Sequence, residues 1–77
     1  SQTDYLSALQ SFQSSRSQVE SAQRYLDDMS KRYREGPALY IEYLDARNEL
    51  TNSELQQSIN LANVWVKWAE VQRAAGK

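Results

Sequence analysis

The side chains of this chain that could carry chemistry are carboxylates. Glu42 and Asp45 lie three residues apart, and Asp27 and Asp28 are adjacent. Residues three apart share one face of a helix, so Glu42 and Asp45 would be neighbours. A symmetric assembly would multiply that pair into an acidic ring, and carboxylate rings at a constriction select cations. The adjacent pair is typical of a solvated helix surface. A second interpretation of Glu42 and Asp45 is local neutralisation by basic residues close in sequence, namely Lys31, Arg32, Arg34 and Arg47.

Other groups that commonly perform catalysis or bind ligands are missing from the sequence. The 77 residues include no cysteine and no histidine, which excludes a disulfide-stapled scaffold and a conventional zinc module. Without these residues or a glycine-rich phosphate loop, we expect no enzyme, no cofactor and no metal. Nine Lys plus Arg against ten Asp plus Glu give a net charge of −1, so no basic field favours nucleic acid.

Two long helices are the elements that must position the carboxylates. Residues 1–35 contain neither Gly nor Pro, and bulky residues recur every seven positions with smaller ones three residues later. This alternating spacing predicts a helix packed as in a coiled coil. The bulky positions are Tyr5, Phe12, Val19, Leu26 and Tyr33, and the smaller positions are Ala8, Ser15, Ala22 and Met29.

Gly36 and Pro37 interrupt this pattern and predict a reversal of the chain. Glycine readily ends a helix at positive φ, and proline suits the first turn of the next helix. A second run without Gly or Pro follows as far as Ala75. We therefore predict an all-α, antiparallel two-helix coiled-coil hairpin with a helix over about 2–35, a turn at 36–37 and a helix over about 38–75.

The spacing also predicts which residues of the second helix form the seam, meaning the residues that face the other helix. The predicted seam consists of Ile41, Leu44, Asn48, Thr51, Leu55, Ser58, Ala62, Trp65, Ala69 and Gln72. In an antiparallel hairpin it places Ser58 opposite Ser15 and Trp65 opposite Ala8. In the half away from the turn, a large side chain usually faces a small one. Two unrelated amphipathic helices, the alternative, would not require this register.

A second apolar stripe lies beside the predicted seam of the second helix. It consists of Tyr43, Leu50, Leu61, Val64, Trp68 and Val71. A hairpin cannot cover both stripes, and a chain this short buries little surface alone. We therefore expect further helices, either from other copies through self-association or from a larger parent chain. Burial between helices is also a better interpretation of Trp65 and Trp68 than a membrane-interface or ligand-cage role.

The segment YREGPALYIEYLDAR at 33–47 resembles the tip signature of TolC-type outer membrane efflux proteins. That signature has an Arg-Tyr pair, a glycine three residues later and a Leu-Asp-Ala-Gln run after a hydrophobic segment. Here Arg32-Tyr33, Gly36 and residues 44–46 fit it. Arg47 stands where the signature often has glutamine. Ala38 stands where some relatives carry a basic residue that can bridge the acids.

The resemblance implies that the chain is a fragment of a trimeric efflux channel, with a barrel in the outer membrane and a helical tunnel in the periplasm. This hairpin would be periplasmic, with Glu42 and Asp45 at the tunnel entrance. The tip that docks a periplasmic adaptor, itself coupled to an inner membrane pump, would consist of Gly36, Pro37, Ala38 and Leu39.

Two other functions remain open at this point. The chain could be a hairpin of the adaptor, although adaptor tips carry an Arg-Leu-Ser type pattern that residues 36–38 lack. It could also be an unrelated structural coiled coil that serves oligomerisation.

Overall fold

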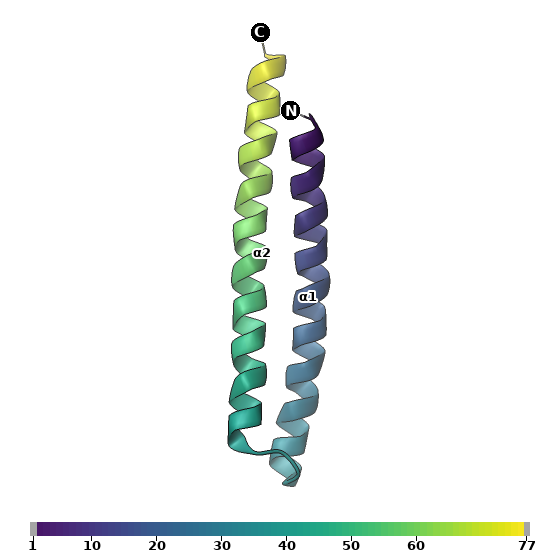
Figure 1. The fold of residues 1–77 in the computed structure, drawn as a ribbon, viewed down its shortest axis with the longest axis vertical. Helices are drawn as coiled ribbons and strands as arrows, with labels where there is room; N and C mark the ends of the chain where they lie inside the picture. The colour runs from purple at the N-terminus through teal and green to yellow at the C-terminus, as the bar shows by residue number, and fades with distance from the viewer. Residues whose placement is uncertain (1, 77) are drawn as a thin grey trace.

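The chain folds into two long antiparallel helices joined by a short loop (Figure 1). The computed structural model describes residues 2–76, in which helix α1 spans Gln2–Glu35 and helix α2 spans Tyr40–Ala75. The molecule measures 63 × 13 × 11 Å. The predicted all-α hairpin is confirmed. Both ends of the chain lie at the same end of the rod, called the open end below, and the loop forms the tip at the other.

Helix α1 ends at a glycine whose backbone angles other residues rarely adopt. Gly36 has a φ of +104°, as the Gly-Pro turn predicts. Its N–H donates to the carbonyl oxygen of Arg32 over 2.9 Å, which closes the helix by the simple five-to-one hydrogen bond. Pro37 has no N–H, so the second hydrogen bond of the longer closing motif cannot form. The chain therefore leaves the axis of α1 at Gly36.

Helix α2 begins at Tyr40, two residues later than the predicted start near 38. Leu39 is extended, with φ −81° and ψ 155°, and its carbonyl oxygen accepts hydrogen bonds from the N–H groups of Glu42 and Tyr43 over 3.0 and 3.2 Å. The side chain of Ala38 is buried at the tip. The connection therefore comprises residues 36–39, and the predicted turn at 36–37 is too short.

Helix α1 faces α2 with the predicted residues. Ala8, Ser15 and Ala22, spaced seven apart, are the most buried side chains of α1. The bulkier seam residues between them, Phe12 and Val19, are half-buried. Within the described residues no large side chain is fully buried, because a single neighbouring helix covers only one side of each. The core of the hairpin is thus a narrow line of small residues.

Helix α2 faces α1 with different residues from those predicted. Ile41, Leu55 and Trp65 of the predicted seam are 66%, 60% and 62% exposed. The observed seam lies two positions further along and keeps the alternating spacing of three and four. Its buried or half-buried members are Tyr43, Ala46, Leu50, Ser53, Gln57, Asn60, Val64, Lys67 and Val71. Four of these belong to the stripe that the sequence analysis assigned to other helices. Leu61 and Trp68 of that stripe are exposed, and Leu44 and Ala69 of the predicted seam are half-buried, so the two stripes exchange roles in part.

The pairing across the seam is also corrected. Ser15 bonds to Asn60 and not to Ser58, and the ring of Tyr33 stacks on Tyr43 with centroids 5.5 Å apart. Ser15 and Asn60 are both polar, and Tyr33 and Tyr43 are both aromatic, so neither of these pairs joins a large residue to a small one.

The length of the loop explains the shift of two positions. Because the connection has four residues, 36–39, α2 starts two residues later in the sequence than it would after a connection of two residues. Because seam positions recur after three or four residues, this shift turns a different side of α2 toward α1. The side that faces α1 contains Leu50 and Val64, whereas the predicted side would have buried Asn48 and Thr51. The observed side also carries the polar residues Ser53, Gln57, Asn60 and Lys67. Burial of apolar surface alone therefore does not select the register, and the length of the loop does.

Candidate functional site at the hairpin tip

The loop at the tip presents a small exposed surface. Gly36, Pro37 and Leu39 are exposed, and Leu39 is 66% accessible. Ala38, in contrast, is buried, so its side chain belongs to the packing beneath the tip and not to its outer surface. Three of the four residues predicted for adaptor docking are therefore accessible to a partner.

A cluster of three tyrosines joins the two helices directly above the loop. The ring of Tyr33 from α1 lies 5.7 Å from that of Tyr40 and stacks on Tyr43 at an interplanar angle of 12°. The guanidinium carbon of Arg47 lies 5.9 Å from the centroid of the Tyr43 ring, within the range of a cation–π contact. Aromatic contacts of this kind stabilise the tip by about 0.5–1.5 kcal/mol per pair beyond area burial.

Sequence reasoning missed this cluster because the predicted seam turned Ile41, and not Tyr43, toward α1. Tyr40 and Tyr43 are three residues apart on a predicted helix, and that spacing was the available signal for a pair on one face. Because the predicted register of α2 differs by two residues from the observed one, it did not bring Tyr33 of α1 next to Tyr40 and Tyr43.

Glu42 and Asp45 are both exposed on α2, close to the tip. Within the described residues neither forms an ion pair: Arg32 instead bonds to Asp28 through Nε over 3.0 Å, and Arg47 lies against Tyr43. The interpretation in which nearby bases neutralise the two acids therefore has no ion pair to support it in this structure. Both carboxylates point to solvent at the end of the rod.

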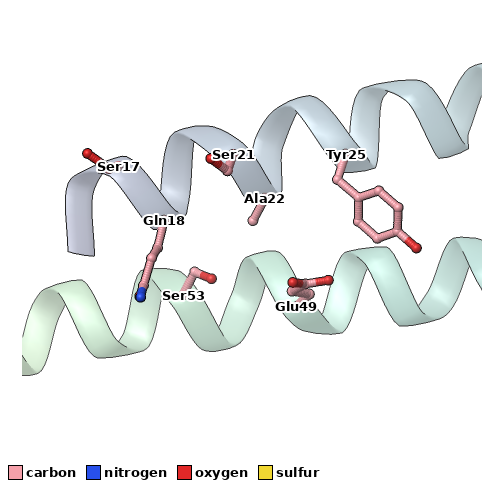
Figure 2. A pocket seen from close by; sticks show the side chains of 7 residues that line it. All are labelled: Ser17, Gln18, Ser21, Ala22, Tyr25, Glu49 and Ser53. Carbon is pink, nitrogen blue, oxygen red and sulfur yellow. The ribbon is translucent and has the colours of Figure 1, made fainter. Parts of the chain in front are cut away.

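A polar flank runs along one side of the hairpin from these acids toward the open end. Some of its members immediately precede a large seam residue. The others lie about one helical turn away from these along the same helix. They include Ser14, Gln18 and Ser21 from α1, and Asp45, Glu49 and Gln56 from α2. Figure 2 shows one of its surface depressions, of about 590 Å³, with Gln18 and Tyr25 extending from α1 toward α2. Glu49 lies across from them on α2 (Figure 2). In the sequence it follows Asp45 by four residues, about one helical turn.

A hydrogen-bonded network crosses the seam beside the polar flank. Asn60 Nδ2 donates to the Ser15 hydroxyl and, over 3.2 Å, to the carbonyl oxygen of Ser11. The Ser15 hydroxyl donates in turn to the same Ser11 carbonyl over 2.9 Å. Gln56 Nε2 donates to Asn60 Oδ1 over 3.1 Å. A polar pair with these partners at one seam layer favours a single register over its neighbours.

The described residues contain neither a cluster suited to a metal ion nor a helix that could span a membrane. No group of three or more acidic side chains within residues 2–76 is arranged to hold a metal ion. Neither α1 nor α2 is apolar enough over a sufficient length to cross a bilayer. Comparisons with protein-family models, with curated proteins and with solved structures found no match to this chain.

Proposed function

We propose that this hairpin is the tunnel-entrance segment of a trimeric, TolC-type efflux channel of the outer membrane. The observation that carries the proposal is the placement of Glu42 and Asp45. Both are exposed, neither has an ion-pair partner among the described residues, and both lie within two turns of the tip loop. Three-fold repetition of such a pair around an entrance would produce a ring of six carboxylates.

The polar flank supports this orientation of the hairpin. A surface that lines a water-filled tunnel must be wettable along its length, and the depressions of this flank are lined largely by Ser, Gln and Asn side chains. Glu42, Asp45 and Glu49 are spaced three and four apart, so they follow the same side of α2. With the polar flank turned to the lumen, these carboxylates approach their symmetry mates at the entrance. Exposed Pro37 and Leu39 then form the end surface that the adaptor contacts.

Single-channel recording on the full-length protein that contains this hairpin tests the proposal. The double variant Glu42→Gln with Asp45→Asn removes two charges per protomer while keeping the shape of both side chains. We expect the permeability ratio of cations to anions to fall several-fold, because carboxylate rings attract cations and repel anions.

The matched control changes the same charge at positions away from the polar flank. Glu20 and Asp27, seven residues apart on α1, are both exposed, and Glu20→Gln with Asp27→Asn should leave the selectivity unchanged. Equal selectivity in the wild type and in the Glu42/Asp45 variant would remove these acids from the entrance and overturn the proposal.

A structural coiled-coil module for oligomerisation is the second candidate. The line of small residues that forms the seam of α1 suits close helix packing in any context, and no large side chain among the described residues is fully buried. This alternative assigns no role to the charges at the tip. If the assembly stays intact and its function does not need the Glu42 and Asp45 carboxylates, the coiled-coil module is favoured over the channel.

A further inference from the structure

An apolar groove lies on the side of the hairpin opposite the polar flank, toward the open end. Tyr5, Leu9 and Phe12 line it from α1, and Leu61, Val64, Trp65 and Trp68 line it from α2. Its volume is about 400 Å³. Leu9, Leu61 and Trp68 each follow a small or polar seam residue. Gln18 and Glu49 of the polar flank each precede a large one, which puts the two surfaces on opposite sides of the seam.

The groove contains both a hollow and a projection. Trp65 is 62% exposed, and its ring meets that of Trp68 edge to face, with centroids 6.0 Å apart. The side chains across from this pair, Leu9 and Phe12, are only half-buried. No lining residue is charged. A partner can therefore cover this surface without burying an unpaired charge, and the partner surface must itself be apolar.

The total solvent-accessible surface of the chain is larger than that of a compact protein of the same mass. The chain exposes 5803 Å², whereas a compact monomer of 8.9 kDa exposes about 4,800 Å². The excess of about 1,000 Å² per chain is similar to the roughly 800 Å² that each partner buries in a standard protein–protein interface. The excess follows from the rod shape, 63 × 13 × 11 Å, and is spread over the whole chain. One contact of standard size along a side of the rod would bring the exposed surface close to that of a compact monomer.

We propose that a second copy of this chain occupies the groove, in a two-fold symmetric dimer. A two-fold axis through the groove places the projecting Trp65 of each copy against the hollow beside Leu9 and Phe12 of the other, so one surface supplies both halves of the contact. A net charge of −1 per chain gives little repulsion between copies. This inference does not rest on the proposed channel function, and it depends on none of the tip residues.

Sedimentation equilibrium and intrinsic fluorescence of the 77-residue chain test the dimer directly. The two tryptophans of the chain both line the groove, so their emission reports its cover. With rising protein concentration we expect the weight-average mass to double and the emission to shift to shorter wavelength over the same range. A chain that stays monomeric, with constant emission, over the micromolar to millimolar range overturns the proposal, and this measurement needs no variant.

A pair of variants localises the contact. Trp65→Glu puts a charge in the groove, and Leu55→Glu puts one at a position of α2 outside the groove that is equally exposed, at 60% against 62%. We expect the dimer dissociation constant to rise at least tenfold for the first and to stay within about twofold for the second. Circular dichroism at matched concentration checks that both remain helical.

Two further outcomes would overturn the proposal. If the two variants weaken association equally, the dimer uses the outer side of α2 and not the groove. If the chain stays monomeric and its tryptophan emission shifts only on addition of neutral phosphatidylcholine vesicles, the groove accepts lipid in place of a second copy.

Discussion

Substitution of Gly36 by alanine tests the physical basis of the hairpin reversal. Gly36 has a φ of +104°, and a Cβ placed on it would have no atom within 4 Å beyond its chain neighbours. The substitution therefore introduces backbone strain without a steric clash. Holding an L-residue at positive φ costs about 1–2 kcal/mol, and we expect the free energy of unfolding to fall by that amount.

Urea denaturation followed by circular dichroism measures this loss. Protein concentration must be the same for every variant, because self-association adds concentration-dependent stability. The thermal midpoint should fall by at least about 4 °C for a chain of this size. Gly36→Asn should lose roughly half as much free energy, since asparagine tolerates positive φ better than alanine does.

Leu39→Ala is the matched control in the same loop. Its side chain is 66% exposed and its backbone is extended, so we expect a change below about 0.5 kcal/mol. An alanine at position 36 that leaves stability unchanged or raises it would refute the argument, because it would show that the reversal does not need positive φ.

Two further substitutions test the register of α2 by the same denaturation assay. Ala46 is completely buried at 0% exposure, so Ala46→Leu should cost about 1–3 kcal/mol through overpacking, whereas the exposed Ala62 of the predicted seam should accept leucine with little change. Equal effects at both positions would contradict the observed register. Asn60→Ala removes the donor to Ser15 and should cost about 0.5–1.5 kcal/mol, while Asn52→Ala, at an exposed position, should cost less; a double-mutant cycle with Ser15→Ala that shows no coupling would exclude the network.

The sequence alone determined the existence of two helices and the side of α1 that is buried. The seven-residue recurrence of Phe12, Val19 and Leu26 with Ala8 and its equivalents has one consistent solution, since α1 offers no competing apolar side. The Gly-Pro pair at 36–37 located the reversal and required positive φ at Gly36, which the structure has.

Only the tertiary structure decided which side of α2 meets α1. Two apolar stripes compete on that helix, and local periodicity ranks them nearly equally. The choice depends on where α2 starts, at Tyr40 and not at Ala38, and a loop two residues longer turns the helix to its other stripe. For the same reason the tyrosine cluster at Tyr33, the Asn60 network and the apolar groove at Trp65 could not be predicted. Each joins residues from both helices, so its existence follows from the register and not from either helix alone.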